Sequence, residues 1–352
     1  MLPSESIAAV AKEMGFELAG VASIAPSARL AGFSDWIAQG RAGAMDYLAR
    51  RGEDGRYLRE QVLNVWPWAR SIVAVAKVYN APLPRSTGRE RDRERGWISR
   101  YAWGDDYHET MRASLDALAQ RLVENSGAQF KTTLDTAPIV ERDVALRAGL
   151  GWQGKNTCLI HPRLGSYFFL GTIVSSLELD SALEQVPDRC GTCTRCIDAC
   201  PTAALTPYAM DASRCIAYLN IELRGTIPEA LRAPMGDNIL GCDICQDVCP
   251  WNRRAAVTHE AAFQPREGLY APLLESLAAL TEEEYRAKFR RSAVKRAKYT
   301  GLMRNLAVAM GNSGDPRHRA RLEGWARGED AMVAEHARWA LEQIADNSEE
   351  TP

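Results

Sequence analysis

Eight of the nine cysteines of the chain lie between Cys190 and Cys249 and have the spacing of iron–sulfur ligands. The first four follow the pattern C-x2-C-x2-C-x3-C directly before Pro201, and the last three follow C-x2-C-x3-C directly before Pro250. In bacterial ferredoxins the first of these patterns gives three thiolates to one [4Fe–4S] cluster and the fourth to the other. Eight thiolates are what two such clusters need. The spacing therefore predicts a ferredoxin-like segment that holds two [4Fe–4S] clusters and carries electrons.

The exchange of the fourth ligand assigns every cysteine of this segment to one of two sets. The first cluster takes Cys190, Cys193, Cys196 and Cys249. The second cluster takes Cys200, Cys215, Cys242 and Cys245. Structural zinc is the alternative because it also binds C-x2-C pairs, but zinc ribbons lack the third close cysteine and the Cys-Pro ending. The ninth cysteine, Cys158, has apolar neighbours and is expected to be a buried thiol that holds no cluster.

The elements that must position this chemistry begin with a mixed helix and strand region over residues 1–180. Ser71–Val78 and Tyr167–Val174 are apolar, β-branched segments typical of strands. Glu109–Asn125 has apolar residues at helical spacing, and Pro138–Ala148 is a second predicted helix with a proline near its first turn. Because strands and helices do not alternate in strict βαβ order and no GxxxxGK[ST] motif is present, we expect no Rossmann or P-loop nucleotide site.

The carboxy-terminal part, Glu282–Ile344, is predicted to be helical. Asp315, which precedes a proline, and Asp330 are candidate caps at the starts of helices. Paired short helices of this kind suggest a small HEAT-like unit.

Two stretches are strongly charged. Arg85–Arg95 has no apolar face and is expected to be a solvated loop, with a mobile lid as the alternative. Arg286–Arg304 holds eight basic residues and no acidic one. Such a stripe can attract a polyanion even when the whole chain is nearly neutral. The alternative for the stripe is a solvated helix face.

The overall composition is that of an ordinary globular chain. The 352 residues include 43 basic and 45 acidic side chains, for a formal net charge of −2, and 46% are hydrophobic. These values exclude a collagenous, coiled-coil or disordered chain. No apolar run is long enough to span a bilayer, and the amino terminus lacks the features of a signal peptide. Clustered cysteines also suit a reducing compartment, so we expect a cytoplasmic protein without a membrane partner.

Several segments together resemble the epoxyqueuosine reductase family. They are residues 134–179 (LDTAPIVERDVALRAGLGWQGKNTCLIHPRLGSYFFLGTIVSSLEL), the cysteine motifs CGTCTRCIDACPTAAL and GCDICQDVCPWN, and the segments SRYAWGDDYH and KYTGLMRNLAVAMGN. The resemblance covers nearly the whole chain. It implies an α+β fold with an α/β cobalamin-binding catalytic domain over 1–180. A double-cluster ferredoxin-like domain over 181–260 and a helical, HEAT-like, tRNA-contacting region over 261–352 would follow.

The activity implied by this resemblance is that of an oxidoreductase. It would reduce the epoxide of epoxyqueuosine to queuosine at the tRNA wobble position, the last step of queuosine formation. The resemblance implies base-off cobalamin beside the two clusters, with cob(I)alamin attacking an epoxide carbon. The expected substrates are the anticodon stem-loops of the tRNAs for Tyr, His, Asn and Asp. A monomer that receives electrons from a low-potential donor such as flavodoxin or ferredoxin is expected.

Asp135 matches the proton donor of the family. Its position before Ala137 and Pro138 also suits a helix N-cap, and a helix amino terminus favours the carboxylate over the acid. To donate a proton near neutral pH, the Asp135 carboxyl would have to be desolvated.

The resemblance implies three further groups of site residues. The expected cobalamin contacts are Arg142, Lys155, Asn156, Thr157 and Cys158, most of them in the segment GKNTCLI. The expected substrate pocket contains Tyr107 and His108. Because the basic stripe agrees with a tRNA substrate, RNA phosphates are expected at Lys295, Arg296 and Lys298.

Other functions could use the same cofactors. A corrinoid-dependent reductive dehalogenase of small organohalides would usually carry an export signal and would not need the basic stripe. An iron–sulfur electron-transfer protein would need neither the large amino-terminal region nor Asp135. A nucleic-acid-binding protein with a purely structural cluster would not need eight ferredoxin-spaced thiolates.

Overall fold

The computed structural model describes residues 4–90, 92–124, 126–181 and 185–349. Its amino-terminal half is built on a four-stranded sheet of order β1-β2-β7-β4, in which all neighbouring strands are antiparallel. Three shorter pairs are β3 with β10, β5 with β6, and β8 with β9. The strands are β1 Leu18–Ser23, β2 Ser71–Val78, β3 Trp97–Ile98, β4 Phe130–Thr133, β5 Trp152–Gln153, β6 Leu159–Ile160, β7 Phe168–Ser175, β8 Leu205–Thr206, β9 Ala209–Met210 and β10 Asn238–Leu240.

The helices of the described residues vary from single turns in the cysteine segment to long helices near the carboxyl end. They are α1 Ser4–Glu13, α2 Phe33–Ala38, α3 Tyr107–Val123, α4 Glu141–Arg147, α5 Arg195–Asp198, α6 Glu229–Arg232, α7 Ile244–Asp247, α8 Leu274–Ala278, α9 Glu282–Lys288, α10 Tyr299–Ser313, α11 Arg319–Ala326 and α12 Ala331–Glu349.

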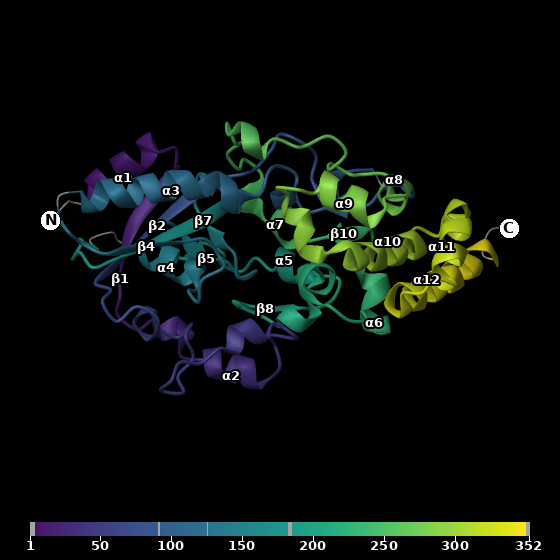
Figure 1. Ribbon diagram of the computed structural model, residues 1–352, viewed down its shortest axis with the longest axis horizontal. Coiled ribbons are helices and arrows are strands. Elements are labelled where there is room, and N and C mark those ends of the chain that lie inside the picture. Colours follow the sequence, from purple (N-terminus) through teal and green to yellow (C-terminus); the bar gives the residue numbers. More distant parts are fainter. Residues whose placement is uncertain (1–3, 91, 125, 182–184, 350–352) are drawn as a thin grey trace.

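Helices cover both faces of the four-stranded sheet (Figure 1). All eight residues of β2 are buried, and alternate side chains of a strand point to opposite faces. Val73 and Val75 pack with α1 and α3, whereas Ile72, Ala74 and Ala76 pack with α4. Burial on both faces explains why this strand is a continuous apolar run in the sequence.

The predicted strands are confirmed, the first without change and the second displaced by one residue to Phe168–Ser175. The first predicted helix is confirmed as α3. It begins at Tyr107 because the Asp106 side chain accepts a hydrogen bond from the His108 amide at 3.1 Å. The predicted last residue of this helix, Asn125, lies outside the described residues. Arg91 of the first charged run also lies outside them.

A second core lies in the carboxy-terminal part. Trp97 and Ile98 of β3 are buried in the same cluster as Leu306 of α10 and Ala337 of α12. The pairing of β3 with β10 brings this early segment to the late helices, which form the end of the molecule farthest from the sheet (Figure 1). The division into three domains at residues 180 and 260 stays a prediction.

The helical character of Glu282–Ile344 is confirmed, with interruptions by 3₁₀ turns at Ala293–Ala297 and Pro316–His318. Asp315 and Asp330 both accept backbone amide hydrogen bonds, at 2.9 and 3.0 Å. Asp315 therefore caps the second 3₁₀ turn, which leads into α11, and Asp330 caps α12.

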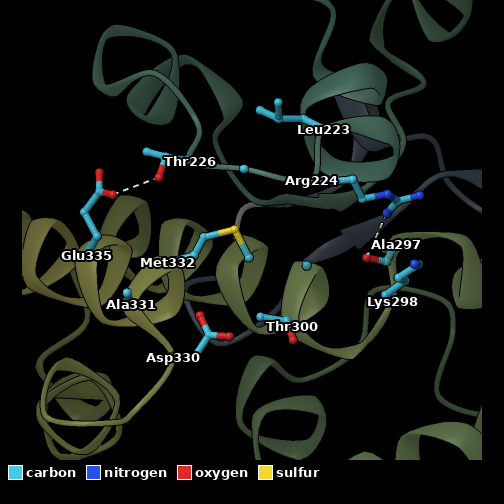
Figure 2. Close-up of a pocket in the computed structure, with 12 residues that line it drawn as sticks. Leu223, Arg224, Thr226, Ala297, Lys298, Thr300, Asp330, Ala331, Met332 and Glu335 are labelled. Carbon is cyan, nitrogen blue, oxygen red and sulfur yellow. Dashed lines mark hydrogen bonds between the residues drawn. The ribbon is translucent and has the colours of Figure 1, made fainter. Parts of the chain in front are cut away.

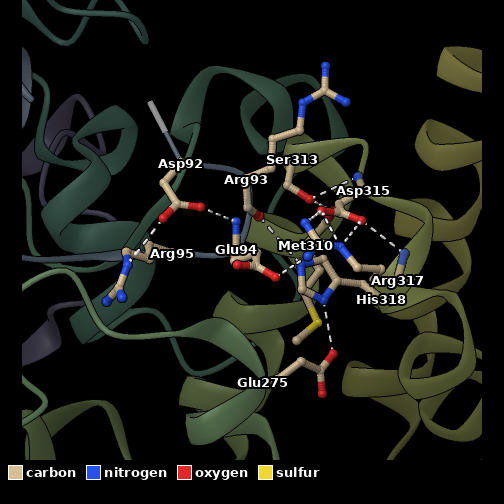
Figure 3. A network of polar contacts seen from close by, with 10 residues as sticks. All are labelled: Asp92, Arg93, Glu94, Arg95, Glu275, Met310, Ser313, Asp315, Arg317 and His318. Atoms are coloured by element: carbon tan, nitrogen blue, oxygen red, sulfur yellow. Dashed lines mark hydrogen bonds and ion pairs between the residues drawn. The ribbon is translucent and has the colours of Figure 1, made fainter. Parts of the chain in front are cut away.

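The charged run Arg85–Arg95 is not the solvated loop that the sequence predicts. Arg89 forms an ion pair with Asp237, and its side chain is only 10% exposed. Glu94 forms an ion pair with Arg317, beside the polar network of the late helices (Figure 3). The described residues of this run are therefore fixed to the protein surface by long-range ion pairs. A local pattern could not show this, because the partners come from segments more than 100 residues away.

Candidate active site

The fold gathers the two predicted sets of cysteines separately, and all nine thiols are free of disulfide bonds. Burial is the first cause that raises the pKa of Cys249, to about 11, and the charges of Cys158, Cys190 and Cys196 raise it too. The late Cys249 is thus a neighbour of the early cysteines. Apart from Cys158, whose charge acts on thiols of both sets, the thiols that influence one another are Cys190, Cys193, Cys196 and Cys249 in one set, and Cys200, Cys215, Cys242 and Cys245 in the other.

This arrangement suits two clusters better than a zinc ion. Four thiolates around one Zn²⁺, at a Zn–S distance of about 2.3 Å, must lie close together. Within the ranges described above, no group of three or more His, Cys, Asp or Glu side chains is gathered closely enough to hold a single metal ion. In an iron–sulfur cluster the four thiolates bind different irons and lie farther apart. Eight free thiols in two sets of four are the number that two [4Fe–4S] clusters need, and the ligand of each iron stays a prediction.

The loop of residues 154–158 holds the cysteine segment in place. The Lys155 ammonium donates to two carbonyl oxygens of the first cysteine loop, at 2.7 and 3.0 Å. The amide of Asn156, which is buried, donates to the Cys245 carbonyl at 3.2 Å. Cys158 contacts the same segment, where its hydrogen bond with the Cys245 thiol lowers the pKa of Cys158. In this structure these three predicted cobalamin ligands thus contact the cluster loops.

The remaining two predicted cobalamin ligands contact each other. Arg142 of α4 donates to the carbonyl oxygen of Thr157 at 2.7 Å and to its hydroxyl at 3.1 Å. Thr157 has a φ of 65°, in the left-handed region that is uncommon for a β-branched residue. The pair joins α4 to the loop that holds the cysteine segment.

A cavity of about 960 Å³ opens between α3, the loop after β4 and the 3₁₀ turn Ala293–Ala297. It brings together residues that lie far apart in the sequence. All the residues predicted for catalysis, substrate binding and RNA binding line it, namely Tyr107, His108, Asp135, Lys295, Arg296 and Lys298.

Asp135 lies where this cavity meets a second one of about 380 Å³. Its φ of 36° is left-handed, a strained conformation for a residue other than glycine. The alternative of a helix N-cap is wrong, as is the predicted helix start at Pro138, because α4 begins only at Glu141 and Val140 precedes it as the cap residue. The Asp135 carboxylate instead points to two side chains of α3. It accepts a hydrogen bond from the Tyr107 hydroxyl, and its Oδ1 lies 2.7 Å from Nε2 of His108.

His108 is held between two carboxylates. Its Nδ1 lies 2.7 Å from Oδ1 of Asp106, and its Nε2 faces Asp135. Burial alone would lower the pKa of His108, but the hydrogen bonds with Asp106 and Asp135 outweigh burial and raise this pKa to about 9. Burial would raise the pKa of Asp106, but the hydrogen bonds with His108 and Lys295 hold it well below its ordinary value. The site therefore contains a cationic imidazole near neutral pH.

The second cavity connects Asp135 to the cysteine segment. Its lining includes Tyr107 and Asp135, which it shares with the first cavity, and also Arg142 and Cys242. It is lined as well by Glu141, which the sequence analysis missed. Burial raises the pKa of Glu141 to about 7, and its Oε1 is shielded from solvent without a hydrogen-bond partner. The only signal in the sequence was its place before Arg142.

Several residues of the basic stripe are paired with acidic residues or buried, which its sequence does not suggest. Lys295 forms an ion pair with Asp106 at 2.8 Å, and Arg296 forms two hydrogen bonds with Glu222 at 2.9 and 2.8 Å. Arg304 is 1% exposed and donates to backbone carbonyls, so its assignment to an exposed stripe is wrong. Acidic partners are absent from the stripe itself, but the fold supplies them from other segments.

A further cavity of about 560 Å³ adjoins the first (Figure 2). It lies between residues 223–226 and the amino ends of α10 and α12. Arg224 and Lys298 line both cavities. Lys298 has a φ of 61° and directly precedes α10. Arg224 and Lys298 therefore lie at the boundary between the two cavities.

Two family models and several curated relatives show which proteins the chain resembles. The family model described as "4Fe-4S double cluster binding domain" matches residues 189–252, and the one described as "Epoxyqueuosine reductase QueG, DUF1730" matches residues 59–136. The chain is 39% identical over 349 residues to the epoxyqueuosine reductase of Xanthomonas campestris pv. campestris, with 96% of this chain and 95% of that one covered.

Solved structures give the same result. A crystal structure of epoxyqueuosine reductase with an epoxyqueuosine-modified tRNA-Tyr stem loop matches with a TM-score of 0.86 at 29% identity, over 98% of this chain and 90% of that one. A structure of the Bacillus subtilis epoxyqueuosine reductase matches with a TM-score of 0.85 at 28% identity, over 97% and 90%. In that structure the catalytic loop, which bears an aspartate, is swung out of the active site.

No helix among the described residues is long and apolar enough to cross a membrane. Residues 189–252 form a double [4Fe–4S] cluster domain, and the cavity beside them lies in a mixed helix and sheet fold shared with solved reductases. The near full-length similarity shows that the chain is an oxidoreductase that belongs to the epoxyqueuosine reductase family.

Proposed function

We propose that the chain reduces the epoxide of epoxyqueuosine in tRNA to the alkene of queuosine, using cobalamin and two [4Fe–4S] clusters, with Asp135 as the proton donor. The observation that carries this proposal is the position of Asp135. It lines both the first cavity, which has basic residues at its rim, and the second cavity, which reaches the cluster cysteine Cys242. A nucleotide in the first cavity and a redox cofactor in the second would therefore meet at this carboxyl group.

Two polar groups of the second cavity suit the edge of an amide-rich cofactor. The unpaired Oε1 of Glu141 could accept a hydrogen bond from an amide N–H, and the Arg142 guanidinium could donate to an amide oxygen. Cobalamin, when bound, would supply a strongly reducing cobalt that can act as a nucleophile toward an epoxide carbon. Lys155 and Asn156 would act indirectly, by keeping the cysteine segment against this cavity.

The protein side chains would handle the oxygen atom. Breaking the C–O bond of an epoxide leaves negative charge on oxygen, and a positioned acid lowers the barrier by protonating it. Asp135 lies in the first cavity, where the ribonucleotide would bind, and Tyr107 and His108 fix the orientation of its carboxylate. The aspartate-bearing catalytic loop of the Bacillus subtilis enzyme supports this role, because Asp135 of this chain lies on a loop as well, the one that follows β4.

The rim of the first cavity would bind RNA. Arg224, Arg296 and Lys298 line it and could contact phosphates, which position an RNA without reading its sequence. The reductase structure with a modified tRNA-Tyr stem loop supports an anticodon stem-loop as the substrate. The tRNAs for Tyr, His, Asn and Asp, a flavodoxin-like or ferredoxin-like donor, and a monomeric enzyme complete the proposal.

Product analysis with and without cobalamin tests this function. The reconstituted protein is incubated anaerobically with an epoxyqueuosine-containing tRNA-Tyr stem-loop and a low-potential chemical reductant. The modified nucleoside should lose one oxygen atom by mass only when cobalamin is added. Conversion without cobalamin, or no conversion by protein that has bound both cobalamin and iron, would contradict the proposal.

A further inference from the structure

Deoxygenation of an epoxide needs more protons than one carboxyl group carries. In the balanced reaction the epoxide takes up two electrons and two protons, both C–O bonds to the oxygen break, and the products are an alkene and one water. A single acid at Asp135 accounts for one of the two protons. The site must therefore be recharged during each turnover.

The structure also shows where the proton of the resting site lies. Both ring nitrogens of His108 are 2.7 Å from carboxylate oxygens, of Asp106 on one side and Asp135 on the other. An ionised carboxylate can only accept hydrogen bonds, so both nitrogens must donate, which only the doubly protonated imidazolium can do. The Tyr107 hydroxyl donates to the same Asp135 carboxylate. Two donors on Asp135 indicate that the transferable proton rests on His108.

Asp106 fixes the far side of the ring. Its side chain is 5% exposed, caps α3 through the His108 amide, and pairs with Lys295 at 2.8 Å. Asp135 is open by contrast, with 56% of its side chain exposed, and His108 is 31% exposed. The ring can therefore pass a proton only toward Asp135 and the cavity. The other ionisable residues around the cavity are Tyr47, Arg50, Arg59, Tyr101, Glu109, Arg112, Glu222, Arg224, Arg296 and Lys298.

We propose that His108 is the proton reservoir of the reaction and acts through Asp135, while Asp106 is the residue that positions and charges it. This rests on the function proposed above. Nε2–H of the imidazolium passes its proton to Asp135, which delivers it to the epoxide oxygen as the first C–O bond breaks. A solvent proton carried by water in the cavity reprotonates His108, a second proton follows the same route as the other C–O bond breaks, and the oxygen leaves as water. The two electrons come through the reductase cofactors.

Because the relay needs the protonated ring of His108, the reduction rate should depend on pH. With its pKa raised to about 9, His108 is protonated across neutral pH and loses its proton as the pH rises through 9. The reduction rate should therefore fall on the alkaline side, near pH 9. Removing the negative charge of Asp106 should move this fall to lower pH by about 1 to 3 units, the usual effect of one close opposite charge.

Single-turnover rates of the loaded enzyme, measured with saturating modified stem-loop across the alkaline range, test the relay. In His108→Gln the side-chain amide can still donate to Asp135 but cannot titrate. The rate should therefore fall about 10²-fold, and its decrease near pH 9, the alkaline limb of the pH profile, should disappear. In Asp106→Asn the helix cap is kept, because asparagine caps as well as aspartate. Its alkaline limb should move to lower pH.

Glu109→Gln is the matched control, because Glu109 lines the same cavity but pairs with Arg291 and Lys295 instead of His108. It should keep the parental alkaline limb. A parental rate and limb in His108→Gln, or a parental limb in Asp106→Asn, would overturn the relay. Full activity of Asp135→Asn would overturn the proposed proton donor itself, and the relay with it. An inactive Asp135→Asn beside a parental His108→Gln would overturn the relay alone.

Discussion

The proposed reaction needs two parts of the molecule that are built in different ways: an electron side, the cysteine segment through which electrons would travel, and a proton side, the cavity at Asp135 through which protons would travel. The cysteines of this segment lie mostly in two close groups along the chain, Cys190–Cys200 and Cys242–Cys249, with Cys215 between them. The proton side is assembled from α3, the loop after β4 and the turn Ala293–Ala297, which are distant in sequence. Spacing can therefore reveal the electron side, whereas the proton side exists only in the folded chain.

Burial and ion pairs also affect the ionisable groups differently in the cysteine segment and in the cavity at Asp135. Burial raises the pKa of most cluster thiols, as it does for Cys242, so these thiols need a metal to favour the thiolate. In the proton site, ion pairs outweigh burial and keep His108 cationic beside Asp106. The second cavity is the place where the two sides meet, because Asp135 and Cys242 both line it.

The largest effect is expected when a predicted cluster ligand is removed and the proton side is left intact. In Cys249→Ala the first cluster loses one of its four ligands, so iron should fall from about eight to about four per chain, and reduction of the stem-loop should stop. Iron and sulfide analysis after anaerobic reconstitution measures this. Cys158→Ala is the matched control and should keep about eight irons. If both variants lose the same amount of iron, the division between ligand and non-ligand cysteines is wrong.

A smaller effect is expected from one hydrogen bond on the proton side. Tyr107→Phe removes the donor to Asp135 but keeps the ring that stacks on Phe169 with a centroid distance of 4.1 Å. Hydrogen bonds to charged groups are worth about 1.5–3 kcal/mol, so the single-turnover rate should fall by about 10-fold to 100-fold. Iron content should not change. Tyr47→Phe changes a tyrosine that lines the same cavity without touching Asp135, and its rate should stay near the parental value.

The smallest effect is expected at the rim, where RNA would bind. Lys298→Ala should flatten the dependence of stem-loop affinity on salt by about 0.7 in the log–log slope, the contribution of one single-strand phosphate contact. Arg286→Ala is the control, because Arg286 is already paired with Glu282 and does not line the first cavity. Titrations at several salt concentrations measure both. An unchanged slope in Lys298→Ala would show that this rim is not an RNA contact.

Much of the fold was predictable from local patterns. The strand Ser71–Val78 and the caps at Asp315 and Asp330 depend on burial and on hydrogen bonds within a few residues, so the sequence contains them. The start of α4 was mispredicted because Pro138 suits a first helical turn. The fold instead uses residues 135–140 to turn Asp135 into the cavity.

What the sequence could not provide were the long-range partners. Glu222 neutralises Arg296 from 74 residues away, and Asp237 fixes Arg89 from 148 residues away. Local charge runs contain no information about such pairs. Asp106 is a further example. It lies in the segment SRYAWGDDYH, but its ion pair with the distant Lys295 could not be predicted from the sequence.

The central claim is that Asp135 joins the two sides by delivering the proton. The most direct test is the single-turnover rate of Asp135→Asn, measured on enzyme whose iron content and cobalamin uptake have been determined in the same sample. We predict parental iron and cobalamin and a rate lower by about 10²- to 10⁴-fold, the usual contribution of general acid catalysis. A parental rate at parental loading, or a loss of cobalamin that accounts for the loss of rate, would contradict the account.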